Sequence, residues 1–250
     1  MPEYSDLFLS YQLSTTGLHA YFDFNEGTPW RSESSLGSSS ATISTKHWDQ
    51  VQIGAGRNAL QFDGSSTIRH IWSDDYLNKV APDGKSISVQ FRADDVPEDR
   101  TQILLETGDG RNGLNIYLQG DQLVVGAWQK GVWNSFLTRD MPTDGGWHQV
   151  GFSYEIENGN GMLRAYLDGS QFGESAVGAF GAFSQYITLG GTSGGTKILG
   201  GQLPGSNRFA GEIGEIAVYD RAVIASEMAV MATATTQTII GTPEDDQLEG

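Results

Sequence analysis

The feature that most constrains the fold is a period-two alternation of apolar and polar residues that recurs along almost the whole chain. It occurs in short runs at residues 18–24, 59–63, 67–72, 86–92, 101–107, 113–119, 122–128, 147–155, 162–169, 186–190 and 213–220. Turn-forming pairs such as Gly120-Asp121, Asn158-Gly159 and Asp168-Gly169 separate several of these runs. Such pairs suit tight hairpins because they tolerate positive φ. The pattern predicts an all-β fold, an antiparallel sandwich of two sheets.

One segment favours a helix, the run AVIASEMAVMA at residues 222–232, with Ser226 as its N-cap. Long loops are expected at residues 31–40, 73–84 and 191–206, and loops of this length either bind ligands or cover the sheets. Residues 1–16 contain an apolar run at 7–13, so we expect an N-terminal extension that forms an extra edge strand.

Charge and composition exclude several classes of function. The chain carries 31 acidic and 15 basic residues, a net charge of −16, which repels phosphate backbones and argues against nucleic acid as a partner. It has no cysteine, so it forms no disulfide. No apolar run approaches the ~20 residues of a membrane-spanning helix, and no membrane insertion is expected.

Five segments, in this order, resemble the laminin-G-like, concanavalin-A-like jelly-roll domains of bacterial extracellular proteins. They are GLHAYFDFNEG from residue 17, NALQFDGSSTIRHI from 58, GGWHQVGFSYE from 145, MLRAYLDGSQFGES from 162 and FAGEIGEIAVYDRAVIASEM from 209. The resemblance covers residues 17–232 and implies a jelly-roll sandwich with one short helix near the C-terminus. Residues 1–16 would precede this domain and residues 233–250 would follow it.

The last residues, GTPEDDQLEG from 241, resemble the start of a repeats-in-toxin (RTX) calcium-binding array. One repeat cannot complete a calcium cage, because stacking needs about three, so residues 233–250 are expected to form a linker and a first repeat without fixed structure. An ordinary acidic tail is the alternative. The resemblance implies a piece of a longer secreted bacterial protein, exported by type I secretion with a C-terminal signal outside this chain.

Calcium is the cofactor that the resemblance implies, since jelly-roll relatives often hold one structural ion between the first turn and the last strand. By position, the ligands would be Asp23, Glu26, Asp63, the Gly64 carbonyl and Glu215, all hard oxygen donors. The family commonly has Asp-Glu in its closing strand where this chain has Gly214-Glu215, so one expected carboxylate is missing. The alternative is that these acids are simply solvated.

Catalytic motifs are weak in this sequence. Retaining glycosidases need two carboxyl groups about 5–5.5 Å apart, and the pair to consider is Glu212 and Glu215. In a regular strand, residues three apart face opposite sides, so this pair is not expected to act together. Ser193 fits Gly-x-Ser-x-Gly, but no helix follows it. The domain itself is therefore predicted not to be an enzyme.

Aromatic residues near predicted loops or strand ends suit sugar binding, because flat rings stack on pyranose faces. The candidates are Trp30, Trp48, Trp72 with Asp74 and Tyr76, and the pair Trp128 and Trp133 around a Lys-Gly turn. Core packing is the competing role for each tryptophan.

The leading hypothesis is a non-catalytic carbohydrate-binding or adhesion module of a large secreted RTX protein, with a glycan or polysaccharide as ligand. Three alternatives stay open. The domain could be an accessory lectin-like domain of a polysaccharide-degrading enzyme, a protein–protein adhesion module, or itself a hydrolase or lyase.

Overall fold

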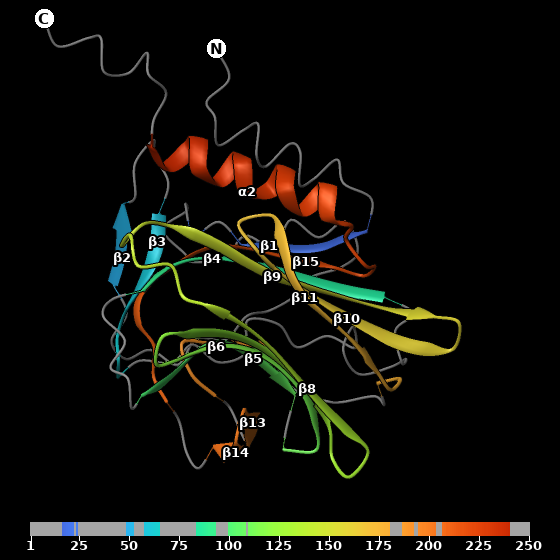
Figure 1. The fold of residues 1–250 in the computed structure, drawn as a ribbon. Helices are drawn as coiled ribbons and strands as arrows, with labels where there is room; N and C mark the ends of the chain where they lie inside the picture. Colours follow the sequence, from blue (N-terminus) through green and yellow to red (C-terminus); the bar gives the residue numbers. More distant parts are fainter. Residues whose placement is uncertain are drawn as a thin grey trace, which may run out of the picture.

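The computed structural model describes residues 17–22, 24, 49–52, 58–65, 84–93, 100–108, 110–180, 187–192, 195–203 and 207–240. Two antiparallel sheets pack face to face in this part of the chain, as the alternation predicts (Figure 1). A helix covers the outer face of one sheet, and a short hairpin lies on the outer face of the other.

The larger sheet has eight described strands in the order β11-β10-β9-β4-β15-β3-β2, and β1 also pairs with β15. These strands are β1 (Leu18–Phe22), β2 (Asp49–Gln52), β3 (Asn58–Asp63), β4 (Gly84–Ala93), β9 (His148–Glu157), β10 (Asn160–Leu167), β11 (Ser170–Val177) and β15 (Ala210–Tyr219). The turns β9–β10 and β10–β11 form at Asn158-Gly159 and Asp168-Gly169, and all four residues have positive φ. The predicted hairpins at these pairs are therefore confirmed.

The smaller sheet has five described strands in the order β12-β5-β6-β7-β8. They are β5 (Thr101–Gly108), β6 (Asn112–Gln119), β7 (Gln122–Gln129), β8 (Trp133–Asp140) and β12 (Ile187–Leu189). A separate hairpin is formed by β13 (Thr196–Ile198) and β14 (Gly201–Leu203), within the segment 191–206 that was predicted to be a loop.

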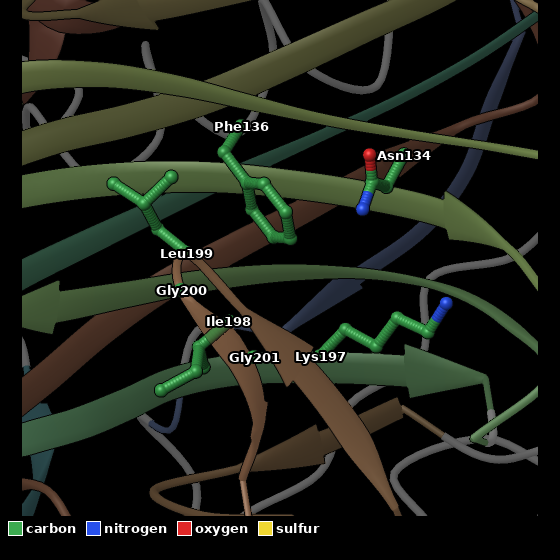
Figure 2. A pocket seen from close by; sticks show the side chains of 7 residues that line it. All are labelled: Asn134, Phe136, Lys197, Ile198, Leu199, Gly200 and Gly201. Carbon is green, nitrogen blue, oxygen red and sulfur yellow. The ribbon is translucent and has the colours of Figure 1, made fainter.

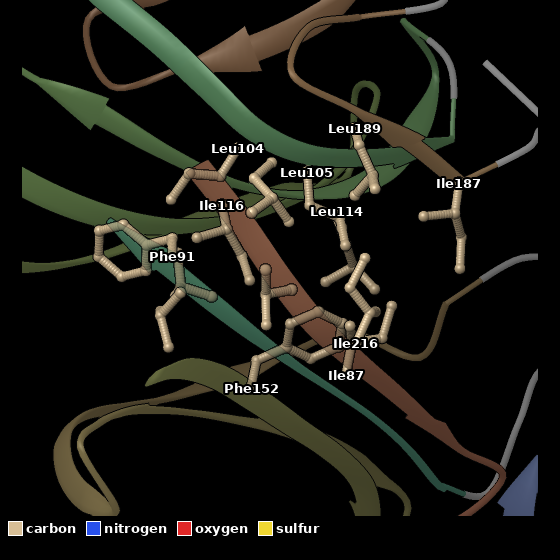
Figure 3. Close-up of a cluster of buried hydrophobic side chains, with 14 of the residues drawn as sticks. Ile87, Phe91, Leu104, Leu105, Leu114, Ile116, Phe152, Ile187, Leu189 and Ile216 are labelled. Atoms are coloured by element: carbon tan, nitrogen blue, oxygen red, sulfur yellow. The ribbon is translucent and has the colours of Figure 1, made fainter. Parts of the chain in front are cut away.

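The hydrophobic core fills the space between the two sheets (Figure 3). Val150, Phe152 and Tyr154 point into it from β9, and Leu114 and Ile116 point into it from β6. All five side chains are buried, so each removes nearly its whole apolar surface from water. The even-numbered residues Val150, Phe152 and Tyr154 of β9 therefore face the core.

Helix α2 (Ala225–Ile240) covers the outer face of the larger sheet. Met228 and Met231 pack on Tyr166, Ala217 and Tyr219 in a second buried cluster. No helix within the described ranges has the length and hydropathy needed to cross a membrane.

The N-terminus of α2 is stabilised by Glu227 rather than by Ser226. The Glu227 carboxylate accepts a hydrogen bond from the Ile224 N–H at 3.0 Å and forms an ion pair with Arg221, which lowers the pKa of Glu227. Ser226 is exposed inside the first turn, so its prediction as the N-cap is wrong. The helix also continues to Ile240, beyond the predicted end at residue 232.

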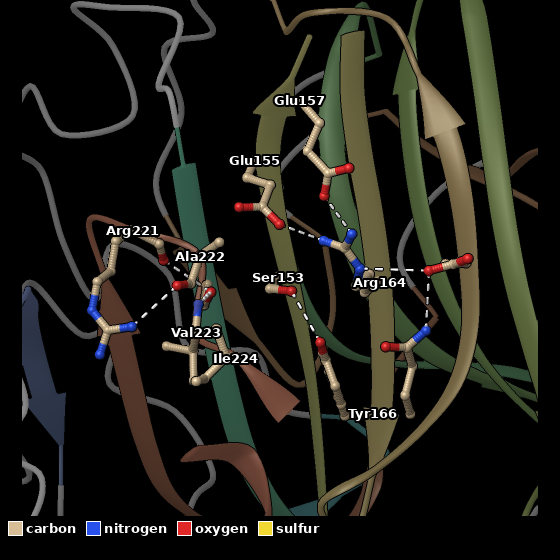
Figure 4. A network of polar contacts seen from close by, with 12 residues as sticks. Ser153, Glu155, Glu157, Arg164, Tyr166, Arg221, Ala222, Val223 and Ile224 are labelled. Carbon is tan, nitrogen blue, oxygen red and sulfur yellow. Dashed lines mark hydrogen bonds and ion pairs between the residues drawn. The ribbon is translucent and has the colours of Figure 1, made fainter. Parts of the chain in front are cut away.

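Beyond the area covered by α2, ion pairs join the strands of the larger sheet. Arg164 on β10 pairs with Glu155 and Glu157 on β9 and with Glu174 on β11 (Figure 4). The three carboxylates share the single guanidinium group of Arg164. These ion pairs therefore form a structural network that links neighbouring strands.

Sequence analysis identified no alternating run for β2, β8 or β11, which are three of the strands at the edges of the two sheets. Edge strands are exposed along one side, so polar residues occur on both of their faces and the alternation weakens. The predicted run 67–72, the extension 1–16 and the RTX-like residues 241–250 lie outside the described residues.

Candidate functional site

The outer face of the smaller sheet carries a row of four residues that lie side by side on adjacent strands. Glu106 on β5 is in register with Asn115 on β6, Asn115 with Gly126 on β7, and Gly126 with Phe136 on β8. Glu106 and Asn115 are fully buried, and Phe136 is half-buried. Buried polar side chains on the outside of a sheet indicate that another segment covers this face.

The covering segment is the β13–β14 hairpin, which two side chains of β6 fasten to the sheet. Asn115 Nδ2 donates hydrogen bonds to Thr196 Oγ1 at 2.8 Å and to the Lys197 carbonyl at 2.7 Å. The Leu199 N–H donates to Tyr117 Oη at 2.7 Å. Burial raises the pKa of Tyr117, so its phenol stays protonated at neutral pH. The hairpin is therefore held at its base and at its tip.

Gly126 makes the row possible because it has no side chain. A Cβ at this position would lie 2.2 Å from Asn115 Oδ1 and 3.0 Å from Phe136 Cδ1. Any larger residue would therefore displace either the fastening carboxamide or the aromatic ring.

A pocket of about 520 Å³ opens between β8 and the hairpin, a volume within the range of small-molecule sites. Figure 2 shows its lining, and we call this site the hairpin pocket: Asn134, Phe136, Lys197, Ile198, Leu199, Gly200 and Gly201. The Phe136 ring lies between a polar end, with Asn134 and Lys197, and an apolar end, with Ile198 and Leu199.

The lining suits binding better than acid–base chemistry. An aromatic ring, a carboxamide and an ammonium group are the groups that contact the faces and hydroxyls of a sugar. None of these lining residues carries a carboxylate, an imidazole or a nucleophilic hydroxyl. Sequence analysis did not select any of them, although it flagged the loop at residues 191–206.

The predicted pair Trp128 and Trp133 is not brought together at the β7–β8 turn. Trp128 is fully buried, with its ring against Gly113, where a Cβ would lie 2.5 Å from Cζ2. Trp133 points to the other face of the sheet and packs edge-on against Phe180 at 4.8 Å. Core packing, the alternative role, describes both rings here. Trp30, Trp48, Trp72, Asp74 and Tyr76 lie outside the described residues.

The described members of the predicted calcium set do not fit a single ion. Asp63 closes a local turn, since its Oδ1 accepts hydrogen bonds from the Ser65 N–H and hydroxyl at 2.8 and 2.7 Å. Asp63 is in register with Ala210, and Glu215 lies five residues further along β15, roughly 16 Å at the rise of a strand. The described part of the chain contains no cluster of three or more metal-binding side chains. Asp23 and Glu26 lie outside it, and Gly64 follows Asp63 in the same turn.

The expectation that Glu212 and Glu215 face opposite sides is wrong, because β15 is not a regular strand. A bulge between Ile213 and Ile216 places two residues opposite one on β4. Glu212 then pairs with Arg92, and Glu215 accepts a hydrogen bond from Gln90 at 3.2 Å. Gln90 and Arg92 share one face of β4, so both carboxylates lie on the outer face of the larger sheet.

His148 joins two connections at one end of the larger sheet. Its Nδ1 contacts Asp168 Oδ2 and its Nε2 contacts Asp144 Oδ1, each at 2.8 Å. Burial alone would lower the pKa of His148, but the two carboxylates outweigh burial and raise it. With both ring nitrogens occupied, His148 is a structural clasp between the β8–β9 connection and the β10–β11 turn.

Two antiparallel sheets that pack face to face, with a helix on one outer face and a pocket on the other, define this chain as a β-sandwich domain. The chain belongs to the family described as the concanavalin A-like lectin/glucanases superfamily, whose laminin-G model matches residues 62–229. A comparison with curated proteins finds no sequence match.

Solved structures with similar folds include domain 4 of AbnA, a GH43 extracellular arabinanase from Geobacillus stearothermophilus, in complex with arabinotriose. It has a TM-score of 0.60 and 18% identity, over 86% of this chain and 98% of that one. The receptor-binding domain of botulinum neurotoxin type G has a TM-score of 0.63 and 11% identity, over 88% of this chain and 52% of that one. The binding domain of botulinum neurotoxin DC, in complex with rat synaptotagmin II, has a TM-score of 0.62 and 11% identity, over 87% and 51%.

This chain spans about half the length of the neurotoxin domains that it matches. At these identities the likeness establishes the shared fold and nothing finer. The predicted jelly-roll sandwich of the concanavalin-A-like type is thereby confirmed.

Proposed function

We propose that this domain is a non-catalytic carbohydrate-binding module and that the hairpin pocket is its binding site. The observation that carries the proposal is the pocket itself, in which Phe136 offers a ring face beside Asn134 and Lys197. A pocket with an apolar surface and a few convergent polar groups is the usual form of a small-molecule site.

Structural relatives support a glycan as the ligand. The arabinanase domain, which this chain covers almost completely, is in complex with arabinotriose. Cell entry of botulinum neurotoxin type C, another protein of similar fold, depends on interaction with two ganglioside molecules. An accessory role beside a polysaccharide-degrading enzyme is one form of the same function.

Two observations favour binding over catalysis. The described residues that line the hairpin pocket include no carboxylate, whereas glycoside hydrolysis uses two. Glu212 and Glu215 do share a face, but they lie on the other sheet and bind side chains of β4.

A protein partner is the second candidate, because one relative of similar fold is in complex with synaptotagmin II. Leu199, at the tip of the hairpin, is 45% exposed and would lie in such a contact.

Residues outside the described ranges extend the proposal. We propose, from sequence alone, that the domain belongs to a secreted bacterial protein with an RTX array and that it acts outside the cell, as an adhesion module or beside an enzyme. Calcium binding stays a prediction, and a melting curve with calcium and then with chelator tests it.

A glycan-array screen of the whole chain tests the proposed function. We expect binding that Phe136→Ala abolishes and Phe172→Ala preserves. Phe172 is the matched control, because it is also a half-buried phenylalanine but lies on β11 and packs against the core. Two results would contradict the proposal: no glycan bound by the folded protein, or undiminished binding by folded Phe136→Ala. The first would favour a protein partner.

A further inference from the structure

We infer that the hairpin pocket takes an anionic saccharide, whose carboxylate or sulfate group binds the Lys197 ammonium. This inference rests on the proposed function and names the class of glycan that the site selects.

The charge of the pocket is opposite to the charge of the chain. The chain has a net charge of −16, yet among the described residues the only charged one in the lining of the hairpin pocket is the cation Lys197. The nearby row on the sheet does contain Glu106, but that side chain is fully buried and is not part of the lining. A ligand therefore meets positive charge here on an otherwise acidic protein.

Lys197 also differs from three arginines near the larger sheet in having no carboxylate partner among the described residues. Arg92, Arg164 and Arg221 each form ion pairs with glutamates. Within the described ranges, no carboxylate lies within ion-pair distance of Lys197, although acidic residues outnumber basic ones two to one in this chain. A half-buried cation without a partner gains more from a ligand anion than a paired one does.

The position of Lys197 is set by the sheet beneath it. Its backbone carbonyl accepts a hydrogen bond from Asn115 at 2.7 Å, so the start of its side chain is fixed relative to β6. Figure 2 shows its ammonium at the same end of the pocket as the Asn134 carboxamide. These two groups would hold one acidic sugar by its anion and a hydroxyl, while Phe136 contacts the ring.

The same charge balance limits the ligand to few acidic groups. The net charge repels long polyanions at distances beyond direct contact, so a mostly neutral glycan with one acidic residue fits best. An ammonium group is a compact charge without planar geometry, and it accepts a carboxylate and a sulfate equally well. The experiment must separate these two sources of anion.

Two matched sets of ligands test the inference by titration calorimetry. One set is lactose, 3′-sialyllactose and 3′-sulfolactose, and the other pairs oligosaccharides of galactose, glucose and mannose with their uronic acid counterparts. We expect the acidic member of at least one set to bind about tenfold more tightly, the size of one charge-assisted hydrogen bond in a half-buried site. The preferred anion shows whether carboxylate or sulfate is the ligand group.

Lys197→Gln should remove the preference for the acidic member and leave the affinity for the neutral member within about twofold, since only the ionic contact is lost. Lys130→Gln is the control, because it makes the same change of charge on the exposed β7–β8 turn. Equal or tighter binding of the neutral member in every set, or a preference that survives Lys197→Gln, would overturn the inference and leave the proposed function intact. Failure to bind any glycan would overturn both.

Discussion

Tyr117→Phe is the substitution that most directly tests how the hairpin pocket is built. The phenol oxygen of Tyr117 accepts the Leu199 N–H at 2.7 Å and anchors the tip of the hairpin. Phenylalanine keeps the ring and its packing with Ile103 and Val124 and removes only the acceptor. Asn115 still holds the base of the hairpin through two hydrogen bonds.

The expected effect follows from the exposure of the two partners. A neutral hydrogen bond contributes about 0.5–1.5 kcal/mol, and an unsatisfied buried donor costs about 1–3 kcal/mol. Leu199 is 45% exposed, so water can reach its N–H after the substitution and the lower range applies. We expect the free energy of unfolding to fall by about 1 kcal/mol. If the substitution loosens the tip of the hairpin, ordering that tip again when a glycan binds would cost up to about 1 kcal/mol, which raises the glycan Kd about fivefold.

Urea unfolding and titration calorimetry with a glycan from the array measure the two effects separately. Tyr154→Phe is the control, since Tyr154 Oη accepts the Phe180 N–H at 3.2 Å in the core between the sheets. It should lower stability by about 1–3 kcal/mol, because Phe180 is buried and its N–H loses this acceptor, and it should leave glycan affinity unchanged. If both variants lose stability and neither loses affinity, the Tyr117 contact does not set the shape of the site.

Three further predictions concern the sheet, the clasp and the helix. Gly126→Ala places a Cβ 2.2 Å from the fastening carboxamide and should cost about 1–3 kcal/mol of stability together with most of the glycan affinity; unchanged affinity in a calorimetric titration would contradict this. The pKa of His148 is raised by Asp168 and Asp144 against the effect of burial, so its stabilisation is fully present below the ordinary value of about 6.5 and is lost as pH rises through the folded pKa. Thermal unfolding from pH 6 to pH 9 should therefore show a decrease in stability that is absent from His148→Gln. If the original protein and this variant had the same dependence of stability on pH, His148 would not stabilise the fold through Asp144 and Asp168. Met228→Ala empties a buried site under α2 and should cost about 2–5 kcal/mol in urea unfolding, while glycan affinity at low temperature stays unchanged because the pocket is on the opposite sheet.

Much of the sandwich could be predicted because a strand with one face in the core leaves a local alternating pattern in the sequence. The runs that became β4, β6, β7 and β9 have one face in the core, and burial on one face requires alternation at period two. The helix could be located from the sequence, but the residue that stabilises its first turn could not. The Ile224 N–H donates its hydrogen bond to the Glu227 carboxylate rather than to a side chain at the cap position.

The hairpin pocket could not be predicted because its parts are distant in the chain. Phe136 is on an edge strand and Lys197 is on a hairpin some sixty residues later (positions 136 and 197). They meet only because Asn115 and Tyr117, on a third strand, fasten that hairpin to the sheet. No spacing in the sequence records such a contact.

Tryptophans were the natural sequence candidates for sugar binding, and Trp128 shows why type alone misleads. Its indole meets Gly113 on the neighbouring strand and is fully buried, whereas the smaller ring of Phe136 lines the pocket. Register, rather than residue type, decides which ring a ligand can reach.

The bulge in β15 is a second feature that only the tertiary structure shows. It turns Glu215 to the same face as Glu212, which simple counting along a strand places on the opposite face. Local patterning of apolar residues and turn pairs thus determined the fold class and most of the strands, since these depend on which residues must leave water, and the resemblance of five segments indicated the family. The site depends on cross-strand register, on one bulge and on where a hairpin is fastened, and only the folded chain brings those residues together.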